Sequence, residues 1–162
     1  MERVIPFTHQ MLEDVIDRND TVIDATAGNG RDTVFLAGLC KHVHAFDIQK
    51  EALENTKRRL KRHGLDNVTL HNMGHEHLDG VAMPPFKAVM FNLGYLPGGD
   101  KTLTTMRGTS LAAIKKAMEG LLEGGIVSIT LYPGHPEGKE EAALIEAYMR
   151  TVDTAVFTVL KY

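Results

Sequence analysis

The sequence predicts an α/β protein with a doubly wound, mostly parallel sheet and helices on both of its faces. Short apolar runs rich in valine and isoleucine alternate with amphipathic stretches, and no repeat or low-complexity tract interrupts them. The 162 residues suffice for one domain, 1–162, and 43% hydrophobic with 24% charged residues is typical of a globular protein.

In the first half of the chain, Thr8 can cap a helix that ends at about Asp17. The apolar residues of its buried face are Met11, Leu12, Val15 and Ile16. Gly64 stands where a C-cap is expected and ends a helix over 49–63. The other expected elements are strands over 21–25, 42–47 and 67–72, and a helix that ends near Gly38.

Proline and glycine divide the second half of the chain. The pair Pro84-Pro85 precedes a strand over 87–93, and Gly124-Gly125 leads into a strand over 126–132. The segment 133–136 (PGHP) breaks the backbone before the last helix. The remaining expected elements are a helix from Thr109 or Ser110 to Leu122, a helix over 137–150, and a sixth strand over 154–162.

Ligands of doubly wound sheets bind at the carboxyl ends of the strands. The functional residues are therefore expected at or just after five positions: Asp24, Asp47, His71, Asn92 and Tyr132.

Composition excludes several classes of protein. With 18 Lys+Arg against 21 Asp+Glu, the net charge of −3 excludes a polycation but permits a local basic patch. The single cysteine, Cys40, excludes an internal disulfide and a multi-cysteine zinc site. No apolar run approaches the ~20 residues that span a bilayer. The N-terminal segment lacks the apolar core of a secretory signal, so a cytoplasmic location is expected.

The strongest motif is VIDATAGNGRDT (22–33), a strand that runs into a glycine-rich turn and a helix. Gly28 and Gly30 allow close backbone approach and unusual φ angles. Asp47 stands at the end of the next strand, where a carboxylate can accept both hydroxyl hydrogens of a ribose. Together these residues predict a site for an adenosine-containing cofactor.

Two cofactors fit this motif. A nicotinamide dinucleotide site normally has a third glycine where Thr33 stands, and Asp32 opposes a pyrophosphate, although Arg31 partly offsets it. S-adenosylmethionine carries no phosphate, and Asp24 suits its ammonium group, directly or through water. The residues favour S-adenosylmethionine, with the dinucleotide as the alternative.

The run DATAGNG, followed by AFDIQ, resembles the first two motifs of Rossmann-like class I methyltransferases. The longer strings VIDATAGNGRDTVFLA, FNLGYLPGGDK and YPGHPEGKEE resemble the YtqB/MnmM family, once labelled rRNA methylases. The resemblance extends from Thr8 to Tyr162, and FNLGYLPGGDK is its most specific part. It implies a methyltransferase domain that uses S-adenosylmethionine. It further implies N-methylation of the aminomethyl group of 5-aminomethyl-(2-thio)uridine at the wobble position of a tRNA anticodon stem-loop.

The methyltransferase hypothesis assigns the cofactor site. In this hypothesis the loop with His75 and Glu76 borders the adenine. The expected cofactor-binding residues are Asp24, Thr26, Gly28, Asn29, Gly30, Asp32, Thr33, Asp47, Ile48, Gln49, His75, Glu76 and Asn92.

The segment Asn92 to Tyr95 resembles the Asn/Asp-Pro-Pro-Tyr motif of amino methyltransferases, in which the amide oxygen accepts a hydrogen bond from the target amine and the aromatic ring stacks on the base. Asn92 and Tyr95 match its outer positions, whereas Leu93 and Gly94 replace both prolines. The direction of the following carbonyl is therefore not fixed. Alternatively, Asn92 only caps the turn after the strand.

A neutral alkylamine already has a lone pair, so alignment rather than a strong base is the main requirement. His135 is expected to shuttle a proton from the substrate or to hold a phosphate, or it only begins a helix. The candidate catalytic residues are Asn92, Tyr95 and His135, and the candidate substrate-binding residues are Leu93, Gly94, Lys101, Arg107 and Tyr132. A metal site is not expected, because the His71, His75 and His77 cluster lacks matching ligands elsewhere.

Class I methyltransferases normally have a seventh, antiparallel strand between the fifth and the sixth, and we expect this sequence to lack or truncate it. A second subunit could cover the open sheet edge, which predicts a homodimer. The alternative substrates of a methyltransferase are rRNA, a small molecule or a protein. The alternative of another class is a non-catalytic Rossmann module that binds nucleotide or RNA.

Overall fold

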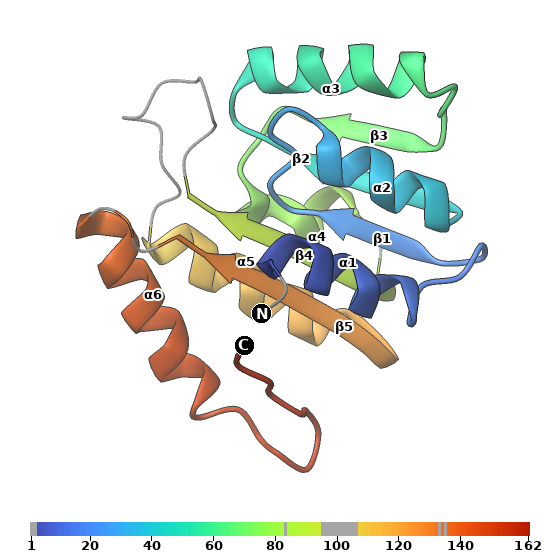
Figure 1. Ribbon diagram of the computed structural model, residues 1–162. Helices are drawn as coiled ribbons and strands as arrows, with labels where there is room; N and C mark the ends of the chain where they lie inside the picture. The colour runs from blue at the N-terminus through green and yellow to red at the C-terminus, as the bar shows by residue number, and fades with distance from the viewer. Residues whose placement is uncertain (1–2, 83, 95–106, 133, 135) are drawn as a thin grey trace.

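The structure, a computed structural model, describes residues 3–82, 84–94, 107–132, 134 and 136–162 (Figure 1). In this part of the chain, five strands form one sheet in the order β3-β2-β1-β4-β5, and each neighbouring pair is parallel. The strands are β1 (Thr21–Asp24), β2 (His42–Phe46), β3 (Val68–His71), β4 (Phe86–Leu93) and β5 (Leu121–Leu131).

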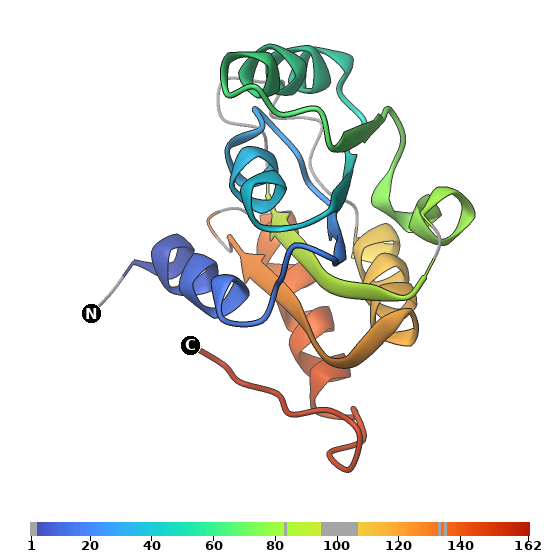
Figure 2. The same cartoon turned by 90° about the vertical axis from the view of Figure 1, so that its right-hand side faces the viewer.

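Helices cover both faces of the sheet (Figures 1 and 2). On one face lie α1 (Val4–Glu13), α2 (Arg31–Leu39) and α3 (Lys50–Arg62). On the other lie α4 (Leu78–Val81), α5 (Arg107–Glu119) and α6 (Pro136–Met149), and a 3-10 turn, η1 (His75–His77), precedes α4.

Alternation along the strands creates two separate cores, because successive side chains of a strand point to opposite faces. In β4, Ala88 and Met90 pack toward α1–α3, whereas Val89 and Phe91 pack toward α4–α6. With both faces covered, the strands read as nearly continuous apolar runs. The polar residues at the carboxyl ends of β1, β2 and β4 therefore stand out.

Several element boundaries differ from the prediction. The first helix begins at Val4, and Thr8 is buried inside it rather than capping it. Pro6 is tolerated because it lies in the first turn, where backbone N–H groups have no intrahelical partner. The fifth strand begins at Leu121, since Leu121 pairs with Phe86 before a register shift. The short elements η1 and α4 were not predicted.

The prediction of a sixth strand over 154–162 is wrong: the structure shows turns and irregular backbone there. The segment has the valine-rich pattern of a strand, but a strand also needs a neighbouring edge with which to hydrogen bond. Two side chains of the segment contact helices: Tyr162 stacks on Phe7 of α1, and Lys161 Nζ lies 2.9 Å from Glu146 Oε1 of α6.

Candidate functional site

The loop between β1 and α2 is shaped by two glycines with left-handed backbone. Gly28 has a φ of 52° and Gly30 a φ of 79°, which side-chain-bearing residues adopt at a cost. A Cβ at Gly30 would also lie 2.7 Å from Thr56 Oγ1. Position 30 therefore requires glycine for both conformation and space.

Helix α3 stabilises this loop through three hydrogen bonds. Thr56 Oγ1 donates to the Gly28 carbonyl at 3.0 Å, Asn55 Nδ2 donates to Asn29 Oδ1 at 2.9 Å, and Arg59 Nε donates to the Asn29 carbonyl at 2.9 Å. These three α3 residues were missed by sequence reasoning. Their spacing along the helix was the available signal, but it does not identify the loop that they contact.

Asp47 follows β2 and lies against the same loop. Its Oδ2 accepts from the Gly28 N–H at 2.9 Å and its Oδ1 from the Gln49 N–H at 2.8 Å. Asn72 Nδ2 donates to the carbonyls of Asp47 and Ile48, which ties the end of β3 to this turn. Burial raises the pKa of the Asp47 carboxyl above its ordinary value.

Asp24 lies behind the loop rather than at its surface. It is fully buried, and its oxygens accept from the Thr26 N–H at 3.1 Å and from Thr33 Oγ1 at 2.6 Å. Burial raises the pKa of the Asp24 carboxyl to about 7. Asp24 and Thr33 thus join the end of β1 to the first turn of α2, and neither carboxylate oxygen is exposed.

His75, the first residue of η1, lies next to the loop that follows β1. Its Nδ1–H donates to the Ala25 carbonyl at 3.1 Å, which leaves Nε2 facing Ser110 Oγ at 3.4 Å. Ser110 Oγ in turn donates to Glu141 Oε1 at 2.6 Å. All three side chains are buried. Burial lowers the pKa of His75. These contacts join η1, α5 and α6 beside the end of β1.

Asn92, near the end of β4, meets the loop from the other side. Its backbone N–H donates to Thr26 Oγ1 at 2.7 Å, and its Nδ2 donates to Asp32 Oδ2 at 2.7 Å. The amide oxygen Oδ1 is buried and has no hydrogen-bond partner within the described part of the chain. An unsatisfied buried acceptor is rare and calls for an explanation.

Asp32 has a second partner, which sequence reasoning missed. His9 of α1 donates from Nε2 to Asp32 Oδ1 at 2.7 Å, and its ring stacks on Phe35. Asp32 is the second residue of α2, where the positive end of the helix dipole favours a carboxylate. No sequence spacing links His9 to Asp32, because the contact depends on how α1 packs.

Gly94 and Tyr132 lie side by side at the ends of β4 and β5. A Cβ at Gly94 would lie 3.3 Å from the Tyr132 ring, and Tyr132 is 47% exposed. Partial burial, with the charge of Asp32, raises the pKa of the Tyr132 phenol. Leu93 is buried in the core.

Five further residues were predicted for the site. Tyr95, Lys101 and His135 lie outside the described residues, and Arg107 is the first residue of α5. Glu76 follows His75 in η1, and its backbone carbonyl accepts from Lys116 Nζ at 2.5 Å.

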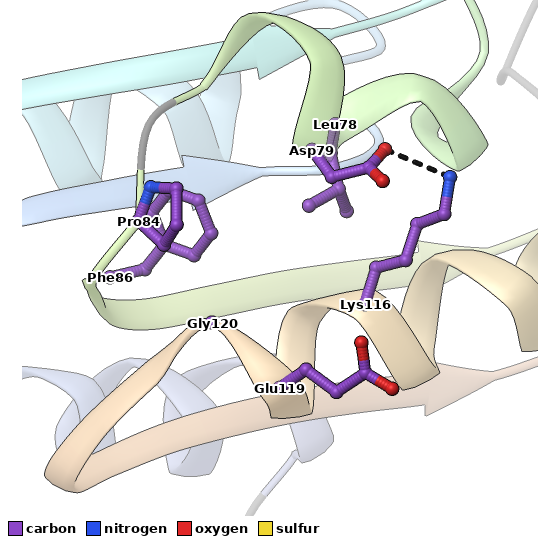
Figure 3. Close-up of a pocket in the computed structure, with 7 residues that line it drawn as sticks. All are labelled: Leu78, Asp79, Pro84, Phe86, Lys116, Glu119 and Gly120. Atoms are coloured by element: carbon purple, nitrogen blue, oxygen red, sulfur yellow. Dashed lines mark hydrogen bonds and ion pairs between the residues drawn. The ribbon is translucent and has the colours of Figure 1, made fainter.

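A small hollow of about 170 Å³ lies at the opposite end of the sheet (Figure 3). Phe86, the first residue of β4, and Gly120, which precedes β5, line it, and Lys116 pairs with Asp79 beside it at 2.8 Å. Because the strands are parallel, this hollow is separate from the site at their carboxyl ends.

Two kinds of feature are absent from the described residues. No three His, Cys, Asp or Glu side chains there are arranged to hold a metal ion. No helix there is both long and apolar enough to cross a bilayer.

Comparison with known proteins identifies the family. Residues 43–162 match the family described as "Putative rRNA methylase". The chain belongs to this family. A "putative rRNA-methylase" from Clostridium thermocellum has a TM-score of 0.93 and 41% identity, over 96% of this chain and 86% of that one. A "putative methyltransferase" from Streptococcus mutans, in complex with SAH, has a TM-score of 0.93 and 40% identity, over 99% and 88%.

A relative from Arabidopsis thaliana, named tRNA (mnm(5)s(2)U34)-methyltransferase, chloroplastic, is 41% identical over 155 residues. The alignment covers 86% of this chain and 56% of the relative. The comparisons confirm the predicted family and the Rossmann-like class I methyltransferase fold.

Proposed function

We propose that this methyltransferase N-methylates the aminomethyl group of 5-aminomethyl-(2-thio)uridine at the wobble position of tRNA. The observation that carries the proposal is the buried Oδ1 of Asn92, at the end of β4 beside the glycine loop; this oxygen has no hydrogen-bond partner among the described residues. An amide oxygen in this state suits an N–H donor on the substrate. The name of the Arabidopsis relative supplies the substrate class.

The residues fit S-adenosylmethionine as cofactor. Each carboxylate oxygen of Asp47 accepts one hydrogen bond from the chain, which leaves one further lone pair on each for the two ribose hydroxyls. Gly28 to Gly30 hold the loop beside this carboxylate, and His75 and Glu76 follow on the next strand-end loop. When bound, the cofactor supplies a methyl group on a sulfonium, which is electrophilic without help from a metal.

The chain's contribution to the reaction is alignment. Asn92 Oδ1 accepts an N–H of the substrate amine, which directs the nitrogen lone pair and favours the ammonium that develops on it. We assign stacking on the base to Tyr95, contacts with anticodon stem-loop phosphates to Lys101 and Arg107, and a proton shuttle to His135. Gly94 and Tyr132 complete the proposed acceptor side, to which Leu93, whose side chain is buried in the core, contributes only its backbone.

One alternative has support of its own: the description of the family favours rRNA as the acceptor. Incubation with labelled S-adenosylmethionine separates the two. Bulk tRNA from a strain that lacks the activity, and matched rRNA, are offered separately, and the labelled nucleoside is identified after digestion. Label in 5-methylaminomethyl-(2-thio)uridine supports the proposal. Label confined to rRNA, protein or small molecules contradicts it.

A pair of variants ties this result to the site. Asn92→Ala is expected to abolish most of the label. Asn19→Ala changes an asparagine whose side chain is exposed on the turn before β1, and is expected to keep full labelling. Equal labelling by both variants would remove Asn92 from the proposed site.

A further inference from the structure

His9 reaches the site through Asp32, although α1 precedes every element of the predicted site. The Asp32 carboxylate accepts from His9 Nε2 on Oδ1 and from Asn92 Nδ2 on Oδ2, each at 2.7 Å. The His9 ring stacks almost parallel on Phe35, with centroids 3.7 Å apart and planes 5° apart. One chain of hydrogen bonds thus joins α1, α2 and β4.

The hydrogen bond with Asp32 decides which way the Asn92 amide faces. The carboxylate of Asp32 can only accept, so the favourable orientation turns Nδ2 toward it. The reverse orientation would set Oδ1 against a carboxylate oxygen. In the orientation seen, Oδ1 is buried where no other described residue hydrogen bonds to it.

His9 keeps Asp32 from turning. With a donor on each oxygen, rotation of the carboxylate breaks both hydrogen bonds at once. The donor on the His9 side is itself fixed by its stack on Phe35, one turn along α2 from Asp32. His9 adds little to the core, since Leu12 and Ile16 are the buried residues of this segment that join the α1–α3 core.

We propose that His9 is a positioning residue: by holding Asp32, it fixes the Asn92 amide with Oδ1 ready for the acceptor amine. The inference rests on the proposed function for the identity of that amine. The rival role is an anchor for α1, in which case the loss of His9 lowers stability alone.

Two variants of His9 separate these roles. His9→Phe keeps an aromatic ring to stack on Phe35 and removes the N–H donor, whereas His9→Gln restores a side-chain N–H donor. Phe7→Leu is the matched control, because Phe7 is the other stacked aromatic residue of α1 and contacts Tyr162 instead of Asp32.

The first readout needs neither cofactor nor substrate. In ¹⁵N-labelled full-length protein, His9→Phe is expected to shift the side-chain amide resonances of Asn92, and Phe7→Leu is expected to leave them in place. Unmoved Asn92 resonances in a folded His9→Phe protein would overturn the inference.

The second readout is kinetic. Loss of a hydrogen bond to a charged group predicts that His9→Phe lowers kcat about ten-fold. KM for tRNA and for S-adenosylmethionine is expected to stay within about two-fold of wild type if only alignment is lost. His9→Gln is expected to recover most of kcat. A lower melting temperature with unchanged kcat would show an anchor and contradict the proposal.

A double-mutant cycle tests whether His9 acts through Asp32. In an Asp32→Ala background, His9→Phe is expected to cause no further loss of kcat, whereas losses that multiply would refute the coupling. If the wild-type protein methylates no aminomethyluridine, the proposed function fails. The Asn92 resonances then still decide the inference about His9.

Discussion

The backbone N–H of Gly28 donates to Asp47 Oδ2 at 2.9 Å, across 19 residues of sequence. The glycine loop and the acid after β2 are therefore one structural unit, which α3 supports through Thr56. Since Asp47 both shapes the loop and keeps lone pairs for a ligand, its replacement is expected to affect the loop and the ligand together.

Asp47→Ala is expected to weaken S-adenosylmethionine binding by about 10- to 100-fold, because hydrogen bonds to a charged group are lost. Isothermal titration calorimetry measures this directly. Asp66→Asn removes an exposed acid before β3 and is the matched control, with wild-type affinity expected. Equal affinities for wild type and Asp47→Ala would exclude the carboxylate from the cofactor site.

Gly30→Ala is expected to destabilise the fold by about 1–3 kcal/mol, because the φ of 79° is strained for alanine and the new methyl group would meet Thr56. Urea unfolding gives the free energy. Gly38→Ala, in α2 with open space around it, is expected to be neutral or stabilising. Similar effects of the two substitutions would show that neither backbone strain nor contact with Thr56 operates at position 30.

The pKa of Asp24 predicts how stability depends on pH. Burial raises it from 3.8 to about 7 in the folded protein, so between these values the folded state binds a proton that the unfolded state has lost. The contribution of Asp24 to stability therefore falls as pH rises from about 4 to about 7, and levels off above. Urea unfolding at several pH values in this range gives the free energies of unfolding of the wild type and of Asp24→Asn. The difference, wild type minus variant, is expected to decline as the pH rises. A flat difference would contradict burial of the carboxyl.

Asn92→Ala is expected to lower the rate of methyl transfer about 100-fold, the typical cost of losing one group that stabilises developing charge. Single-turnover assays with saturating tRNA isolate this step. A variant that transfers methyl groups at the wild-type rate would show that Asn92 only ends the strand.

The homodimer remains a prediction about the β5 side of the sheet. Neither His9 nor Asn92 depends on it, so the active site is expected to be complete within one subunit. Light scattering at micromolar concentration is expected to give the mass of two chains, and the mass of one chain would contradict it.

The sequence predicted the five parallel strands because both faces of the sheet are covered, which makes each strand a short apolar run. It also predicted that Asp47 and Asn92 stand at the carboxyl ends of such runs. Because the carboxyl ends of parallel strands lie at the same end of the sheet, their place at strand ends was enough to predict that these two residues lie near each other. The φ angles of Gly28 and Gly30 bear out the expectation of unusual backbone there.

The contacts between distant segments could not be predicted. His9 meets Asp32 only because α1 packs near the start of α2, and no local pattern encodes that docking. The hydrogen bond between buried Asp24 and the hydroxyl of Thr33 in the next helix is likewise a contact that no local pattern encodes. The segment 154–162 shows the opposite error: its composition is strand-like, but a strand also depends on pairing with a neighbour, which local composition does not encode.

Mass spectrometry of an anticodon stem-loop with 5-aminomethyl-2-thiouridine at the wobble position tests the central claim most directly. After incubation with the protein and S-adenosylmethionine, the wobble nucleoside is expected to gain the mass of one methyl group in place of one hydrogen, with fragmentation locating it on the side-chain nitrogen. An unchanged nucleoside, or a methyl group on the base or ribose, would contradict the account.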